Sequence, residues 1–226
     1  DLTLQNALDY YSSGSAGRAV CLQDKGDGTI CKNVKMLSYQ DTYYSNNNGG
    51  KYYWEDSEIH GTVDFLCGGG DVYYNRCKFV VEKRSADGKG GCTIAAPYTD
   101  GSKWGYVMNE CVVDNYAETF NYGRAWGGTP RLAYLNTTLL QPDMIIKDRF
   151  TVGGMNVPAD KFVEFNTKDA QGNVVSPASN VLKFTKDNKV NEMETILTAD
   201  QAAEYALDKV FPTWTPDADC AQVGLG

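Results

Sequence analysis

The sequence predicts an all-β protein, a parallel β-helix in which short strands stack coil upon coil. The first observation is a short pattern, a polar residue or Asn followed by alternating small and apolar positions, which recurs six times. The second is its spacing, because successive copies lie 27, 23, 20, 34 and 26 residues apart, which are solenoid periods. The third is period-two alternation that ends at Gly or Asn turns, without the apolar spacing of a long helix. Units this short leave no room for βαβ crossovers, so stacked coils are favoured.

The elements follow in chain order from a strand over residues 2–4, where the chain reads Leu-Thr-Leu. The repeats are aligned on six positions, which we expect to form one interior column: Ala7, Val34, Ser57, Cys77, Cys111 and Thr137. Cys77 and Cys111 are then neighbours in that column, as buried free thiols. His60, the only histidine, is interpreted as an exposed turn residue.

The repeat fades after Asp143, and the segment from there to Lys189 is polar and rich in turn residues. We expect long loops that decorate one face. Residues 198–206 predict one C-terminal helix, with Thr198 as N-cap and Gln201 completing a capping box. This helix is expected to pack on the solenoid as a terminal cover. Residues 1–226 are expected to form a single domain, and the protein a monomer.

The composition argues against several classes of protein. The net charge is −8 and the 21 Lys and Arg residues form no run, so no nucleic-acid partner is expected. No stretch of about 18 apolar residues occurs, so we expect no membrane span. The seven cysteines do not predict a disulfide scaffold. Without a CxxC pair, and with only one histidine, the sequence predicts no metal site and no other cofactor.

Two aspartates are the strongest candidates for chemistry. Asp41 lies in the segment Tyr39–Thr42, and Asp64 follows 23 residues later in the segment Gly61–Phe65. Residues one coil apart lie on adjacent strands, about 4.8 Å apart, which suits two cooperating acids. The alternative is a pair of solvated turn residues, the usual role of an isolated Asp. A chain with one histidine has little scope for a Ser–His hydrolase, so a shared carboxylate surface is favoured.

The two aspartate segments are followed by Gly123–Trp126, which reads Gly-Arg-Ala-Trp. With these three motifs in this order and spacing, the chain resembles the pectin methylesterases, carbohydrate esterase family 8, in a bacterial-like form. The resemblance extends to Lys161–Asn166 and to the ending around Trp214–Pro216. It implies a right-handed β-helix, secreted to the extracellular space or periplasm, that removes methyl groups from galacturonan (pectin) and releases methanol without a metal. By the same comparison we expect several early coils of the family domain to be missing from this chain.

The resemblance also implies a role for each site residue. Asp64 is the nucleophile, and Asp41 is first the acid that protonates methanol and then the base that activates water. Arg124 keeps Asp64 ionised, while the charge of Asp64 raises the pKa of Asp41. Gln40 donates to the oxyanion, and Trp126 offers a flat face to a sugar ring. Asp64 is expected at the surface, where its loss would leave stability nearly intact.

Three departures from the family pattern concern substrate contacts. The position of the family's first oxyanion glutamine falls on Arg18, which we expect within a few ångströms of both aspartates, lowering the pKa of Asp41. The second aromatic residue after the family's nucleophile falls on Cys67. The Gly-Trp pair that follows the family's Arg-Trp motif has no counterpart between Asp143 and Phe150.

Two alternative functions remain open at this point. A β-helix that binds carbohydrate without catalysis would keep the groove and release no methanol. A pectate lyase-like enzyme would hold Ca²⁺ through clustered acids and use an Arg base, and its product would be unsaturated.

Overall fold

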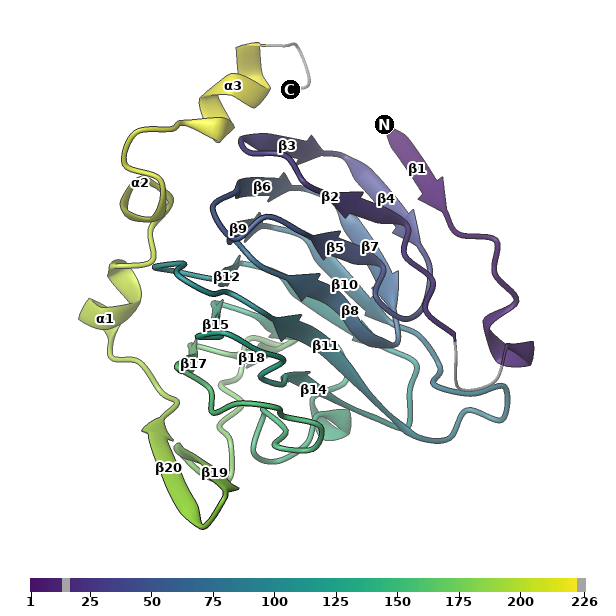
Figure 1. Ribbon diagram of the computed structural model, residues 1–226, viewed down its shortest axis with the longest axis vertical. Coiled ribbons are helices and arrows are strands. Elements are labelled where there is room, and N and C mark those ends of the chain that lie inside the picture. Colours follow the sequence, from purple (N-terminus) through teal and green to yellow (C-terminus); the bar gives the residue numbers. More distant parts are fainter. Residues whose placement is uncertain (14–16, 223–226) are drawn as a thin grey trace.

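The chain folds into a parallel β-helix, as the repeats predict. The structure is a computed structural model and describes residues 1–13 and 17–222. Three parallel sheets run along the solenoid, and the chain visits them in turn once per coil (Figure 1). Seven strands form the first sheet: β1 (Leu2–Gln5), β4 (Val34–Leu37), β7 (Glu58–Gly61), β10 (Lys78–Val81), β13 (Val112–Asn115), β16 (Thr138–Leu139) and β18 (Lys168–Asp169).

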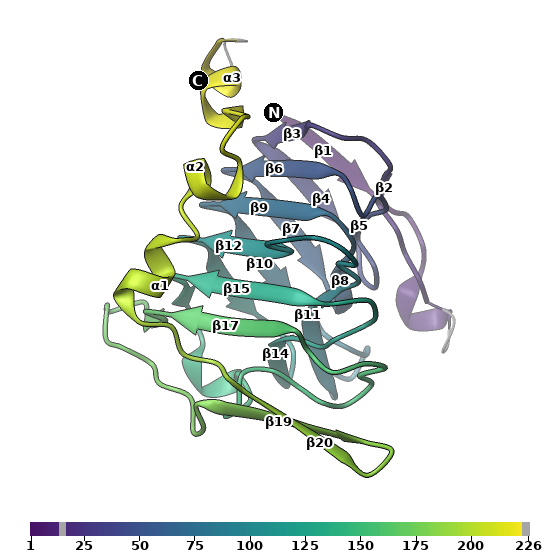
Figure 2. The same ribbon diagram turned by 60° about the vertical axis from the view of Figure 1, so that its left-hand side comes forward.

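The other two sheets complete each coil. Five strands form the second: β2 (Leu22–Asp24), β5 (Tyr43–Ser45), β8 (Val63–Gly68), β11 (Gly91–Pro97) and β14 (Thr119–Gly123). Six form the third: β3 (Thr29–Lys32), β6 (Lys51–Glu55), β9 (Asp71–Asn75), β12 (Tyr106–Asn109), β15 (Arg131–Leu135) and β17 (Lys161–Phe165). Figure 2 shows the third sheet face on, its strands stacked in chain order.

One left-handed residue turns the chain from the third sheet into the first in each coil. These residues have φ between +48° and +56°: Asn33, Asp56, Arg76, Glu110, Asn136 and Asn166. Asn and Asp accept this conformation most readily among residues with a Cβ atom. Neighbouring turns also bond to one another, since Asn166 donates to Asn136 at 2.8 Å and Arg76 pairs with Asp56 at 2.9 Å. The repeating polar residue in the sequence is therefore the corner of each coil.

The residue after each corner points into the core and forms the predicted column. Val34, Ser57, Cys77, Cys111 and Thr137 occupy equivalent positions in adjacent coils and are all buried. Alignment on Ala7 is wrong, because β1 ends at Gln5 and its Leu2 pairs with Val34. The hydrophobic pattern alone did not show where the first strand stops.

The interior is filled by stacked apolar and aromatic side chains, among them Trp54, Tyr74 and Phe79. All seven cysteines are free thiols, and burial raises the pKa of Cys111 well above its usual range. His60 is not an exposed turn residue as expected. It lies on β7 with 15% of its side chain exposed, between Glu82 at 2.7 Å and Glu58 at 2.5 Å. Burial opposes the charge of His60, but hydrogen bonds to these carboxylates outweigh it and raise its pKa.

The repeat does not fade after Asp143, because one further coil is present. Pro142–Met144 form a short 3₁₀ helix, and Ile145 and Phe150 then bridge to β14. The chain continues into β17 and β18, and only then leaves the solenoid as the antiparallel hairpin of β19 (Val181–Lys186) and β20 (Lys189–Glu194). Turn-rich sequence conceals this coil because its second-sheet strand is reduced to two isolated bridges.

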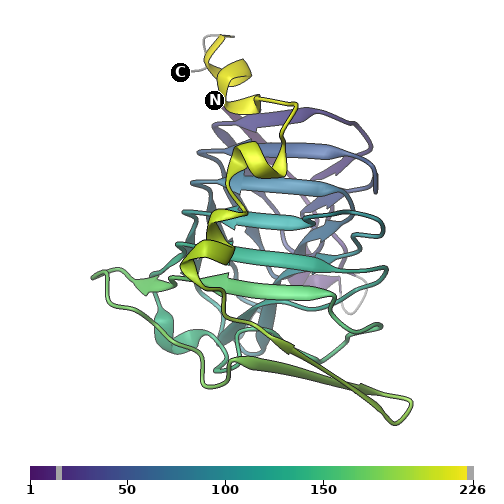
Figure 3. The same cartoon turned by 90° about the vertical axis from the view of Figure 1, so that its left-hand side faces the viewer.

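The C-terminal segment lies along the flank of the solenoid and is not a terminal cover. Thr198 caps α1 (Ala199–Ala203) through the predicted capping box with Gln201. Two further helices, α2 (Leu207–Val210) and α3 (Pro216–Gln222), were not predicted. The three helices run back over the third sheet to the first coil (Figure 3); on the way α2 contacts β9, and at the first coil α3 contacts β3. Among the described residues, no helix has the length and apolar character needed to cross a membrane. A second short 3₁₀ helix, Tyr10–Ser12, precedes β2.

The last complete coil contains a buried ion pair that allows a stability test. Arg149 and Glu164 are each 3% exposed, with Arg149 Nε 3.1 Å from Glu164 Oε1. Glu164→Gln leaves the arginine charge buried without its partner, so we expect the free energy of unfolding to fall by about 3 kcal/mol or more. Urea denaturation measures this. Glu192→Gln is the matched control, because its pair with Lys183 is more than half exposed and should change stability by less than about 1 kcal/mol. Equal effects in the two variants would contradict the buried pair's importance.

Candidate active site

Backbone irregularities position the two aspartates. Asp41 precedes β5 and has φ +58°, and its N–H donates to the carbonyl of Val63 at 3.1 Å. Asp64 has φ +52° and lies at a bulge, where β8 advances by three residues while β11 advances by two. A bulge redirects a side chain out of its strand's alternation. The two carboxylates thereby reach one surface, as the 23-residue spacing predicts.

Arg124 binds Asp64 through both of its carboxylate oxygens. Its Nε lies 2.9 Å from Oδ1 and its Nη2 2.5 Å from Oδ2. The Asp64 side chain is only 6% exposed, which corrects the expectation of a surface residue. Hydrogen bonding to Asp64 raises the pKa of Arg124, so the guanidinium remains charged. A bidentate charged pair of this kind is strong and fixed in direction.

Asp41 is in a different electrostatic environment. Burial and the neighbouring charge of Asp64 raise its pKa to about 6, against the lowering effects of Arg18, Arg124 and a hydrogen bond from Gln40. The two acids therefore differ in their surroundings. Asp64 is paired with a cation, whereas Asp41 can keep its proton in mildly acidic solution.

Arg18 lies near Asp41, as expected, although its bridge partner is one residue before the position to which the 23-residue count aligns it. It pairs with Gln40 as an isolated parallel bridge, and its Nε is 3.6 Å from Asp41 Oδ2. Its side chain is 79% exposed. It does lower the pKa of Asp41, as expected, but burial and Asp64 outweigh it.

A cavity of 90 Å³ brings all the predicted site residues together. It is lined by Arg18, Gln40, Asp41, Asp64, Cys67, Ala96, Arg124 and Trp126. Cys67 is buried in its wall, and burial raises the pKa of the thiol well above its usual range. Among the described residues, no cluster of His, Cys, Asp and Glu has a geometry that could hold a metal ion.

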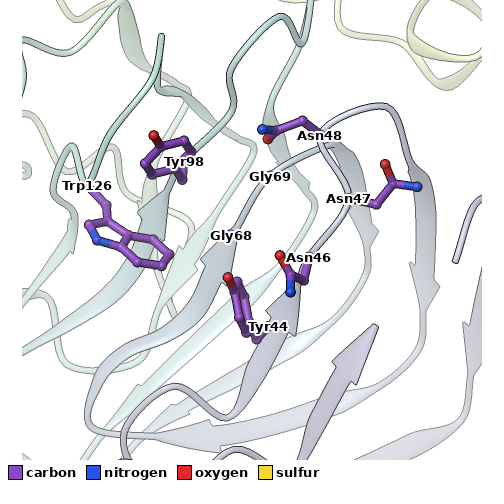
Figure 4. A pocket seen from close by; sticks show the side chains of 8 residues that line it. All are labelled: Tyr44, Asn46, Asn47, Asn48, Gly68, Gly69, Tyr98 and Trp126. Atoms are coloured by element: carbon purple, nitrogen blue, oxygen red, sulfur yellow. The ribbon is translucent and has the colours of Figure 1, made fainter. Parts of the chain in front are cut away.

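A second hollow of 230 Å³ adjoins this cavity and shares Trp126 with it. Figure 4 shows Trp126 and Tyr98 on one side of Gly68 and Gly69, with the three consecutive asparagines Asn46, Asn47 and Asn48 on the other. Tyr44 completes the lining, and its ring lies 6.1 Å from that of Trp126. Rings and amides without charge are suited to a polar, uncharged sugar surface. Sequence reasoning missed this hollow, although the Asn-rich run was visible.

A loop after β14 braces the Arg124 segment, and sequence reasoning missed it too. The carbonyl of Gly154 accepts a hydrogen bond from Nη1 of Arg124. Asn156 donates to the carbonyls of Ala125, at 3.2 Å, and Trp126, at 3.0 Å. Lys186 of the hairpin in turn donates to the Asn156 carbonyl at 2.7 Å. The only sequence signal was the Gly153–Gly154 pair in a segment interpreted as a loop.

The chain is similar to known proteins in both sequence and fold. The Pectinesterase family model matches residues 1–155. The chain belongs to the pectinesterase family. Pectinesterase A of Dickeya dadantii is 30% identical over 95% of the chain, and putative pectinesterase 11 of Arabidopsis thaliana is 32% identical over 59%. The chain spans 65% and 35% of these two proteins, which is less than two thirds of their length.

A solved structure supports both family and fold. The crystal structure of a pectin methylesterase in complex with a hexasaccharide superposes with a TM-score of 0.68 and 26% identity, covering 96% of this chain and 70% of that one. The family resemblance read from the three motifs is thus confirmed, as is the β-helix.

The raised pKa of Asp41 can be measured directly. We expect its carboxyl carbon to titrate near pH 6 in an NMR experiment, with Asp41→Asn used to assign the resonance. Arg18→Gln removes a nearby positive charge, so the pKa of Asp41 should rise further. Lys183→Gln removes one exposed charge from β19, outside both cavities, and should leave the pKa of Asp41 unchanged. An Asp41 pKa near its ordinary value of about 4 would contradict this description of the site.

Proposed function

We propose that the protein is a carboxylic ester hydrolase that removes methyl groups from methyl-esterified galacturonan (pectin) and releases methanol. The observation that carries the proposal is the pairing of an acid of raised pKa, Asp41, with a carboxylate fixed by a guanidinium, Asp64. Acyl transfer without a Ser–His pair needs one group of each kind. Family membership supports the same chemistry.

In the first half-reaction, an oxygen of Asp64 attacks the carbonyl carbon of the methyl ester. The tetrahedral intermediate carries its negative charge on the former carbonyl oxygen, where the amide of Gln40 donates a hydrogen bond. Collapse breaks the bond to the methoxy group, and protonated Asp41 gives its proton to the departing methoxy oxygen, which leaves as methanol. The product of this step is a mixed anhydride between Asp64 and the galacturonate.

In the second half-reaction, Asp41 is ionised and takes a proton from a water molecule. The resulting hydroxide attacks the anhydride, Asp64 leaves as a carboxylate, and Asp41 regains the proton with which the cycle began. Arg124 stabilises Asp64 as the leaving carboxylate. Because the first step needs protonated Asp41, turnover should fall as the pH rises above about 6.

The hollow beyond Trp126 supports a polymeric substrate. The rings of Trp126, Tyr98 and Tyr44 present flat surfaces for sugar rings, and the asparagines offer amide donors and acceptors to hydroxyl groups. The hexasaccharide in the related pectin methylesterase structure is consistent with a groove of several subsites. A polysaccharide substrate lies outside the cell, so we also propose that the protein is secreted. We further propose that residues 1–226 lie in one domain and that the protein is a monomer.

Loss of the nucleophile should abolish activity. Asp64→Asn cannot form the anhydride, so methanol release from highly methylated pectin should fall by roughly 10⁴-fold. The variant also weakens a buried ion pair, so its midpoint of thermal unfolding should fall, and rates must be measured well below it. Asp114→Asn weakens another ion pair with a buried carboxylate, 2.8 Å from Lys78 and outside both cavities, and should keep its activity.

This pair of variants decides between an enzyme and a carbohydrate-binding protein. Comparable methanol release from the wild type and Asp64→Asn would refute the assignment of the nucleophile. No methanol from the wild type, with pectin still bound, would favour the non-catalytic alternative. Unsaturated product that increases with added Ca²⁺ would favour the lyase.

The brace at Gly154 should affect the rate more than substrate binding. A Cβ atom at Gly154 would lie 3.0 Å from Arg124 Nη1, and its φ of +74° disfavours alanine. Gly154→Ala should therefore misdirect Arg124 and reduce kcat about tenfold, or ~1.4 kcal/mol, with a smaller change in KM. Gly172→Ala, at φ +85° with no atom within 4 Å, introduces similar backbone strain away from the site. If both variants lose only stability, the brace has no catalytic importance.

A further inference from the structure

The guanidinium of Arg18 lies at the edge of the cavity over the acids, where its recorded side-chain contact is a long ion pair with Asp41. The backbone here is fixed, since the N–H of Ala19 donates to the Gln40 carbonyl at 2.9 Å and Ser38 donates to the Ala19 carbonyl. The side chain is 79% exposed, and its 3.6 Å approach to Asp41 is too long for a hydrogen bond. It donates no hydrogen bond to any residue in the described ranges 1–13 and 17–222.

The two sides of the acid pair differ in charge. The hollow beyond Trp126 is lined by rings, amides and glycines, with no charged side chain. The cavity over the acids contains two cations, of which Arg124 is occupied by Asp64 and the Gly154 carbonyl. Arg18 is therefore the cation whose donors face solvent and an incoming ligand.

We propose that Arg18 binds the free carboxylate of a galacturonate unit adjacent to the methyl ester under attack. This inference rests on the proposed function and adds a substrate preference to it, for partly de-esterified chains over fully methylated ones. The planar guanidinium matches a carboxylate in geometry and can bond it through two N–H groups, whereas a methyl ester offers it no charge. Neutral, esterified units lie in the hollow beyond Trp126.

The net charge of −8 disfavours binding of a partly de-esterified, anionic chain, but only at long range. Exposed charges more than about 8 Å apart are largely screened at physiological salt, whereas a carboxylate in contact with Arg18 is not. The protein's overall charge therefore slows the approach of a polyanion. Arg18 determines which unit is held once the chain is bound.

The test compares two galacturonate oligomers of equal length, one fully methylated and one with a single free carboxylate next to an ester. For the wild type, KM for methanol release should be lower with the second oligomer. The ratio of the two KM values measures the preference for the oligomer with the free carboxylate. Arg18→Gln should reduce this preference about tenfold, and Arg18→Lys should reduce it less. The ratio at one pH is insensitive to a change in the pKa of Asp41, because both oligomers use the same acid. Lys183→Gln should leave the ratio unchanged.

A binding measurement separates this proposal from the proposed function. Calorimetry with unesterified trigalacturonate should give a dissociation constant that rises about tenfold in Arg18→Gln, with a weaker salt dependence than the wild type. Equal KM ratios and equal trigalacturonate affinities in wild type and Arg18→Gln would overturn the role of Arg18 even if methanol is released. The expected difference in affinity without any methanol release would instead refute only the esterase.

Discussion

In-register hydrogen bonding between coils is the constraint on which the rest of the structure depends. Each strand lies beside the equivalent strand of the next coil, so positions separated by one repeat become neighbours about 4.8 Å apart. The corner residues keep this register because a single left-handed residue turns every coil at the same point. Arg18 and Gln40 are brought together in this way, although 22 residues separate them. The site is thus assembled by stacking, and no long loop is needed to reach it.

Within that framework, the candidate site depends on competing electrostatic effects. The Asp64 carboxylate is almost fully buried and accepts two hydrogen bonds from the Arg124 guanidinium. Asp41 has only a distant contact with a cation and a neighbour of like charge, so burial prevails and its pKa rises. Two residues of the same type therefore have different surroundings in one site. Arg124, the partner of Asp64, directly follows β14 and is held by the loop after it.

Much of this could be predicted from the sequence because a solenoid repeats its local chemistry. The corner residues and the buried column at Ser57, Cys77 and Cys111 were readable as a pattern, and the motifs placed Asp41, Asp64 and Arg124 in one site. What failed depends on contacts that the repeat does not encode. The end of β1, the last coil at β17 and the partners of His60 are set by neighbouring coils. The brace from Gly154 and Asn156 is a loop contact of the same kind.

The C-terminal segment has a consequence for how the molecule unfolds. A repeat array without long-range contacts can fray from either end, because each unit interacts only with its neighbours. Here α3 returns to β3, so residues near position 220 contact residues near position 30 across the length of the solenoid. Phe211 and Cys220 bury apolar surface against the third sheet along this path. Loss of the first coil must therefore release the last helix as well, which links the stability of both ends. The segment thus gives a one-dimensional stack contacts of high sequence separation, which nearest-neighbour packing between coils alone does not supply.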